Sequence, residues 1–254
     1  MKHAVRYSEQ RMDRLTTLID RFRMRVVLAA RGAGNLCVMQ PEAGRQILVF
    51  TPEGWVEDTG AEGVGLALRV DWDGAHNPLV AALPQRVEVD LAEAPALASV
   101  LALLRQEREA HRCGAQSVVS SLGQVLMVRL LRHLIEAGTA APGLLAGLAD
   151  PRLARAIVAM HDAPGRSWTT SDLAQEAGLS LSRFSELFSA QMNETPMGYL
   201  RRWRLTLARQ DLIRGDRVEA VARRYAYDSP EGFARAFRKF YGVAPVSLRQ
   251  STAA

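Results

Sequence analysis

The sequence predicts an α+β protein in two parts: an antiparallel sheet, rolled or sandwiched, with helices in the first half, and an all-helical second half. Short apolar runs separated by glycine-rich turns fill residues 23–72, a pattern typical of antiparallel strands. From residue 151 onward the apolar residues recur at helical spacing. A length of 254 residues with 48% hydrophobic content is sufficient for two packed cores.

In the first half, a short amphipathic helix is expected over Met12–Ile19, followed by five strands. These strands correspond to the runs "RMRVVLAA", "NLCVMQ", "RQILVF", "GWVED" and "VGLALRVDW". Residues 71–78, "DWDGAHNP", predict a loop. Two long helices follow within 95–138, and the broad apolar face of the second predicts a core position or a dimer seam.

A Gly- and Pro-rich stretch, "AGTAAPGLLAGLAD", predicts a linker at residues 141–150. The expected domains are therefore residues 1–140 and 151–254. Charge differs between the two parts: residues 151–254 carry 16 Lys+Arg and 10 Asp+Glu, a net of +6, whereas residues 1–150 carry 16 and 17, a net of −1. A basic second half predicts an anionic partner such as nucleic acid.

The compartment expected from the sequence is the cytoplasm. No run of 18 or more consecutive apolar residues predicts a membrane span, and the N-terminus shows no apolar leader with a cleavage site. The two cysteines, Cys37 and Cys113, are too few for a disulfide framework. We expect no bound metal and no cofactor.

An internal repeat dominates the second half. Residues 169–196 align with residues 217–245, and each unit reads as a short helix, a turn and a second helix that opens on serine, which is the order of a helix-turn-helix. Phe184 and Phe188 of the first unit align with Phe233 and Phe237 of the second. The first turn favours a residue that tolerates positive φ, and Gly178 supplies it.

The second helix of such a unit enters the major groove of DNA, so helical spacing sets which side chains are available to read bases. In the first unit these are Ser182, Arg183, Ser185 and Glu186, and in the second they include Glu231 and Arg235. Further along the second helix, Arg238 and Lys239 suit phosphates. The serines that open the two helices, Ser180 and Ser229, are also expected at phosphates.

A third helix, "PMGYLRRWRLTLARQDLIRG", joins the two units, with proline at its start and Gly215 at its end. At about 1.5 Å per residue it spans roughly 28 Å, near the roughly 34 Å between major-groove segments on one face of DNA. A rod of this length could hold two reading helices in successive grooves. Arg201 on this rod is a further phosphate candidate, and some of its neighbouring arginines could pair with acids inside the domain instead.

Residues 151–250 resemble the C-terminal domain of AraC/XylS-type transcriptional regulators. The motifs that carry the resemblance are W-T-x-x-x-L-A-x-x-A-G-L-S, F-S-x-L-F, P-M-x-Y-L-x-x-W-R-L-x-x-A-R and A-Y-D-S-x-x-x-F-x-R-A-F-R-K-F-Y-G-V-A-P. The resemblance implies a seven-helix DNA-binding domain with two helix-turn-helix motifs, which reads bases at the six positions named above. Glu186 stands where related proteins often have a donor, and Ala226 and Asn193 replace common glycines.

The first half resembles, more weakly, the cupin-type N-terminal domain of one branch of this family. That resemblance implies a small β-barrel with helices, used for sensing and dimerisation. A small-molecule pocket inside the barrel is one alternative and a filled core is the other; the pocket would be lined by Val27, Leu28, Val38, Val49, Leu66 and Leu68.

The function expected is a sequence-specific DNA-binding regulator that responds to a ligand or signal, not an enzyme. Its partners would be double-stranded promoter DNA and a second copy of the chain, with RNA polymerase and a small-molecule effector as further candidates. One alternative is a redox-responsive regulator that uses Cys37 and Cys113, which requires the two sulfurs to lie close together. Another is a module that only dimerises and binds proteins.

Overall fold

The computed structural model describes residues 13–22, 24–42, 44–54, 56, 65–72, 77–110, 112–138 and 141–250. Five strands form one antiparallel sheet, in the order β1-β4-β2-β3-β5. Their bounds are β1 (Met24–Leu28), β2 (Leu36–Glu42), β3 (Arg45–Phe50), β4 (Leu66–Trp72) and β5 (Val87–Asp90). Among the described residues β1 and β5 do not pair, so the sheet is open there rather than closed into the expected barrel.

Four of the five predicted strands are confirmed. The fifth, at 54–58, lies mostly outside the described residues, and of its side chains only Val56 is placed, in a buried position. The helix expected over Met12–Ile19 is observed as α1 (Thr16–Arg21), and Met12 lies outside the described residues. Within 71–78, β4 continues to Trp72 and the next four residues are outside the described part of the chain.

Successive side chains along each strand point to opposite faces of the sheet, so the buried residues of the strands form two separate groups. Leu36, Val38, Leu48 and Phe50 enter the main core, whereas Cys37 and Val49 join a small second cluster with Val56 and Ala67. The predicted pocket lining is therefore split: Leu28, Val38, Leu66 and Leu68 belong to the main core and Val49 to the second cluster. These side chains do not surround one shared interior.

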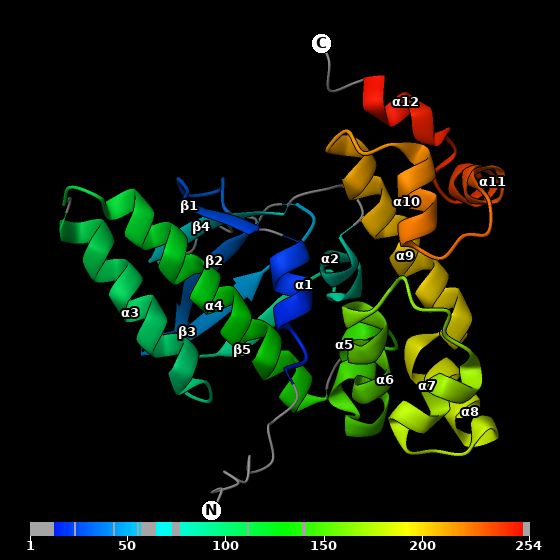
Figure 1. Ribbon diagram of the computed structural model, residues 1–254. Coiled ribbons are helices and arrows are strands. Elements are labelled where there is room, and N and C mark those ends of the chain that lie inside the picture. The colour runs from blue at the N-terminus through cyan, green and yellow to red at the C-terminus, as the bar shows by residue number, and fades with distance from the viewer. Residues whose placement is uncertain are drawn as a thin grey trace, which may run out of the picture.

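Two long helices, α3 (Pro95–Ala110) and α4 (Ala115–Ala137), cover the sheet, as Figure 1 shows. α4 crosses β1 at Gly123, where a Cβ atom would lie 2.5 Å from the Cβ of Val26. By length and composition α4 is also the one helix among the described residues that could cross a membrane. Its buried side chains, which pack in the main core, are those expected of a core helix.

Three short elements were not predicted, and one of them is the edge strand β5. Helix α2 (Pro78–Ala82) has five residues and begins at Asn77, whose Oδ1 accepts the N–H of Leu79 at 2.8 Å. Helix α5 (Leu144–Ala149) lies in the segment predicted as a linker, and its leucines at 144, 145 and 148 are buried. Residues 144–148 of this segment therefore pack against the rest of the molecule, whereas Ala141 and Pro142 before them are exposed.

Seven helices follow, in agreement with the number that the resemblance implies. They are α6 (Pro151–Asp162), α7 (Thr170–Ala177), α8 (Leu181–Met192), α9 (Pro196–Ile213), α10 (Val218–Arg224), α11 (Pro230–Tyr241) and α12 (Pro245–Gln250). In Figure 1 they form the half of the molecule opposite the sheet, with α7 and α8 near one end and α10 to α12 near the other.

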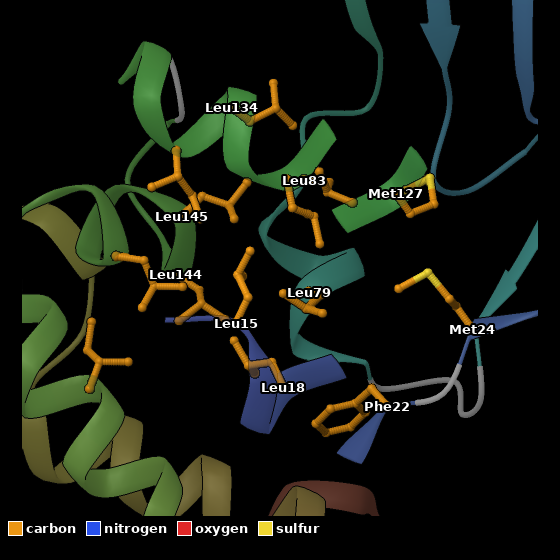
Figure 2. Close-up of a cluster of buried hydrophobic side chains, with 14 of the residues drawn as sticks. Leu15, Leu18, Phe22, Met24, Leu79, Leu83, Met127, Leu134, Leu144 and Leu145 are labelled. Atoms are coloured by element: carbon orange, nitrogen blue, oxygen red, sulfur yellow. The ribbon is translucent and has the colours of Figure 1, made fainter. Parts of the chain in front are cut away.

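The two halves share one hydrophobic core. Figure 2 shows side chains of α1, α2, α4 and α5 converging where the halves meet, including Leu18, Leu79, Leu134 and Leu145. The ring of Phe22, just after α1, lies 5.7 Å from the ring of Trp203 on α9. The helical half is thus held against the sheet half by apolar packing as well as by chain connectivity.

Polar contacts reinforce this junction. Arg14 donates to the carbonyl of Leu148 at 2.7 Å, and the Thr17 hydroxyl donates to the Asp162 carboxylate at 2.6 Å. Further along α1, the side-chain amide of Gln210 donates to the carbonyl of Arg21 at 3.0 Å. Helix α1 and the residues just before it therefore contact α5, α6 and α9.

Candidate nucleic-acid interface

The first helix pair consists of α7, a short turn and α8. Thr169 and Asp172 form a capping box at the start of α7, which satisfies donors that the first helical turn leaves unpaired. These bonds from Thr169 lower the pKa of the Asp172 carboxyl. Gly178 ends the helix at φ 67°, as predicted, and the Ser180 hydroxyl accepts the Arg183 N–H at 3.4 Å to open α8.

The second pair, α10 and α11, repeats the positive-φ turn and the serine cap, whereas α10 itself begins at Arg217 without a side-chain cap. Ala226 holds the turn at φ 55°, in the left-handed region that an L-residue with a Cβ enters at a cost. Ser229 opens α11, and its hydroxyl accepts the Gly232 N–H at 3.0 Å. At the end of α8, Asn193 adopts φ 56°, a conformation that asparagine tolerates better than most residues.

The cores of the two pairs match closely. Phe184 and Phe188 are fully buried with ring centroids 5.5 Å apart and planes at 58°, and Phe233 and Phe237 are fully buried at 5.5 Å and 55°. The sequence repeat is therefore a structural repeat. Phe240, the third phenylalanine of α11, is 44% exposed instead, because it lies near the end of the helix.

Helix α9 joins the pairs and is anchored along its length. Its 18 residues span roughly 27 Å at about 1.5 Å each. Arg202 pairs with Glu194 at 2.5 Å, and Arg204 donates to the carbonyls of Pro164 and Arg166, each at 2.7 Å. Of Arg201, Arg202 and Arg204 on this helix, Arg201 is the one left exposed.

A buried polar cluster fixes the other end of α9, and it was missed at the level of sequence. The carboxylate of Asp211 is almost completely buried and bonds to the guanidinium groups of Arg214 and Arg224 and, at 2.8 Å, to the hydroxyl of Tyr225. Burial, followed by this bond, raises the pKa of Tyr225. Acids and arginines abound in the segment, so composition alone could not single out one buried acid.

A second buried group in the helical half is His161 on α6. Its Nε2 is hydrogen-bonded to the Tyr199 hydroxyl at 2.5 Å, and its ring lies 4.2 Å from the ring of Trp203. Burial, with a smaller effect from the charge of Arg202, lowers the pKa of His161 to about 3. His161 is therefore a neutral core residue that ties α6 to α9.

The six predicted base-reading residues lie on α8 and α11. Ser182, Arg183, Glu186, Glu231 and Arg235 are exposed. Ser185 is partly covered and donates to the carbonyl of Leu181 at 2.9 Å. Arg183 and Glu186 approach to 3.7 Å, and an exposed pair of this kind contributes little stability, so both side chains remain available to a partner.

The predicted phosphate contacts fall into two groups. Arg201, Arg238 and Lys239 are exposed cations. Ser180 and Ser229 use their hydroxyl oxygens to cap α8 and α11, which leaves the hydroxyl hydrogens free to donate. Figure 1 shows α8 and α11 on the side of the helical half that lies away from the sheet, so the first half of the chain does not cover them.

The cysteines do not form a redox pair in this structure. Cys37 is buried on β2 within the small second cluster of the sheet, whereas Cys113 is exposed on the turn between α3 and α4, and neither forms a disulfide. Within the described part of the chain, no group of three or more His, Cys, Asp or Glu side chains is arranged to hold a metal ion.

Comparison with known proteins finds a family match in each half of the chain. Residues 25–136 match the cupin family, and residues 173–251 match the helix-turn-helix domain family. A protein of Streptomyces lividans whose name describes an AraC-like transcription regulator is 34% identical over 180 residues, covering 69% of this chain and 59% of that protein. An HTH-type transcriptional regulator of Haemophilus influenzae is 30% identical over 174 residues, covering 68% and 58%.

Among solved structures, the DNA-binding domain of AdpA in complex with a target DNA aligns with 40% of this chain and 92% of that domain, at 25% identity and a TM-score of 0.38. The assignment of the two domains rests on the sequence matches. The chain spans about three fifths of the length of the two curated relatives.

Proposed function

We propose that this chain, whose halves match the cupin family and the helix-turn-helix domain family and which is similar to an AraC-like regulator, is a sequence-specific DNA-binding transcription regulator. We further propose that α7–α8 and α10–α11 act as two helix-turn-helix motifs, with α8 and α11 in successive major grooves. The observation that carries this proposal is the repeat of turn, cap and phenylalanine pair in two units whose outer helices are both exposed.

The two motifs would contribute unequally to the affinity for DNA. α11 carries three exposed cations, Arg235, Arg238 and Lys239, whereas α8 carries only Arg183, which lies beside Glu186. Phosphate attraction supplies affinity without sequence information, and base edges supply specificity. α11 would therefore contribute most of the electrostatic affinity, and Glu186 could accept a hydrogen bond from the amino group of cytosine.

The sheet half would sense a signal and dimerise. Figure 1 shows α3 and α4 on the outside of this half. Three apolar side chains on these helices are exposed: Leu103 on α3, and Val118 and Val125 on α4. A second copy that packs there would place two DNA-binding domains on one operator. Sedimentation of Val125→Glu beside the parent chain tests this: the parent is expected to be a dimer and the variant a monomer.

Selection of bound genomic fragments by the purified protein would define the operator. A gel-shift series on that site then compares Arg235→Ala with Arg86→Ala, which removes an exposed arginine from the sheet half. Arg235→Ala is expected to lose about 1–3 kcal/mol and to relax preference at one base pair, whereas Lys239→Ala should weaken all sequences alike and reduce the salt slope by about 1. Unaltered binding by both α11 variants would contradict the assignment.

A further inference from the structure

A cleft of about 500 Å³ lies between the sheet half and the helical half. Its walls come from the end of α1 on one side and, on the other, from the turn after α6 and the ends of α9 and α10. Small-molecule sites are common at such boundaries. Two of the lining side chains are carboxylates, of Asp162 and Asp211, and four are guanidinium groups, so the net charge is positive; the four are Arg21, Arg166, Arg214 and Arg224.

Two of the four arginines pair with acids. The buried carboxylate of Asp211 bonds to Arg214 and Arg224, and Arg224 also pairs with Asp216 at 2.6 Å. These bonds use only Nη2 of Arg214 and Nη1 of Arg224, and a guanidinium group has five N–H donors. Both side chains are about half exposed, so a solute in the cleft can reach their other donors.

The other two arginines, Arg21 and Arg166, form no ion pair with the residues that the structure describes. Both are exposed, and they come from different halves of the chain. The Arg21 carbonyl accepts from Gln210 on α9 at 3.0 Å, and the Arg166 guanidinium lies 3.9 Å from the centre of the Trp168 ring. Like charges that share one cleft repel each other, and an anion between them would remove that repulsion.

The turn that carries Arg166 is held by contacts of its backbone. Arg204 donates to the carbonyl of Arg166 at 2.7 Å. At Gly165 an added Cβ would lie 2.3 Å from the carbonyl oxygen of Arg224, so this turn packs directly on the end of α10. The Arg166 side chain is therefore not needed to fix its own backbone, and its N–H groups are available to a ligand.

Asp162 limits which anions the cleft can accept. Its Oδ1 accepts the Thr17 hydroxyl at 2.6 Å, and it forms no ion pair with any described residue. An ionised carboxylate can only accept hydrogen bonds. It therefore repels an anion that has no proton to donate and favours one that carries an O–H group.

We propose that this cleft binds a small oxyanion that carries an O–H group, of which inorganic phosphate is the simplest. Its charged oxygens accept from Arg21, Arg166 and Arg214, because the planar guanidinium group suits phosphate oxygens, and its O–H donates to Asp162. A bound anion joins α1 to the end of α9 and to α10, the first helix of the second pair. Any effect on DNA binding rests on the proposed function, whereas the site itself does not.

Titration calorimetry of the full chain without DNA tests the site, with phosphate and sulfate as probes at equal ionic strength. Sulfate has the same shape but no O–H near neutral pH, so phosphate is expected to bind about tenfold more tightly than sulfate. Arg21→Gln and Arg166→Gln should each weaken phosphate binding about tenfold, as the loss of one charge-assisted hydrogen bond predicts. Asp162→Asn keeps an oxygen for Thr17 and should remove the preference for phosphate over sulfate.

The matched control is Arg223→Gln, which removes an exposed arginine of α10 outside the lining and should bind phosphate like the parent. Urea denaturation in chloride buffer checks that each variant is folded. Equal phosphate binding by the parent, Arg21→Gln and Arg166→Gln, or none by the parent, would overturn the site. Sulfate binding as tight as that of phosphate would overturn the O–H requirement.

A gel shift in phosphate-free buffer distinguishes a free anion from a DNA phosphate. Helix α1 lies between the halves, away from α8 and α11 (Figure 1), so Arg21→Gln should bind the operator like the parent. A loss of operator binding in that variant would mean that Arg21 contacts DNA, which would overturn the small-anion site. The calorimetry uses no DNA, so a failure of this proposal is distinguishable from a failure of the proposed function.

Discussion

At the scale of single residues, the two helix pairs differ most at their turns. Gly178 and Ala226 occupy equivalent positions with φ 67° and 55°, yet only glycine enters this region without steric cost. The alanine is held there by the burial of its neighbours, among them Ala222 and Tyr225. The second turn therefore stores strain that the first does not.

Replacing Ala226 with glycine should relieve this strain. We expect Ala226→Gly to raise the free energy of unfolding by about 0.5–1 kcal/mol. The left-handed conformation costs roughly 1–2 kcal/mol for a residue with a Cβ, and the greater flexibility of glycine in the unfolded chain offsets part of the gain from removing that cost. Urea denaturation measures the change. The control is Ala220→Gly within α10, which should lower stability by about 1 kcal/mol; a loss of stability in both variants would contradict the assigned strain.

His161 predicts a dependence of stability on pH. Its pKa is about 3 in the folded protein and 6.5 when solvated, so below pH 6.5 the unfolded chain binds a proton that the folded chain does not. The free energy of unfolding should therefore fall as the pH falls from 6.5 toward 3, by roughly 2 kcal/mol from this group between pH 7 and pH 5. Urea denaturation of the parent and of His161→Gln at several pH values would isolate this part; identical pH dependence in the two would contradict it.

At the scale of elements, long periodic segments were predictable and short ones were not. The repeat in residues 169–245 specified two helix pairs, their buried phenylalanines and the exposed faces at Ser182 and Arg235, because each depends on local spacing. Helices α2 and α5 have five and six residues, too few to establish a period. The apolar junction between the halves and the buried Asp211 depend on contacts between different elements, which spacing within one element cannot reveal.

The crossing of α4 over β1 is one such contact. A Cβ on Gly123 would lie 2.5 Å from two carbon atoms of Val26, and both belong to the buried core. Helix propensity alone would make Gly123→Ala stabilising by about 1 kcal/mol. We expect a net loss of roughly 1–3 kcal/mol instead, since a crowded core must shift to admit the methyl group.

Chemical denaturation would measure this loss, with Ser121→Ala on the exposed side of α4 as a control expected within about 0.5 kcal/mol of the parent. Combining Gly123→Ala with Val26→Ala should cost less than the sum of the two single changes, because the second alanine makes room for the first. An additive double variant would show that the two residues do not meet.

At the scale of the whole molecule, the sheet half and the helical half form one packing unit. The main core runs without interruption from the strands through α1, α2 and α5 into α6 and α9, and Figure 2 shows its leucines converging at that junction. The outer faces of α8 and α11 remain exposed on the far side. A change in the packing of the sheet half can therefore reach the helices that carry α8 and α11 through packed side chains.

A shared core predicts that the two halves unfold together. Phe22 is 1% exposed and its ring meets that of Trp203 across the junction, so Phe22→Ala should cost about 3–5 kcal/mol and still leave a single transition at lower denaturant. Tryptophan fluorescence and far-UV circular dichroism should give coincident curves in both proteins, as two-state unfolding requires. The exposed-site variant Val246→Ala is expected to unfold like the parent. Two separate transitions in the parent, or a shift of only one of them in Phe22→Ala, would mean that the two halves unfold independently. Any coupling between the halves would then depend on the chain connection and not on the shared core.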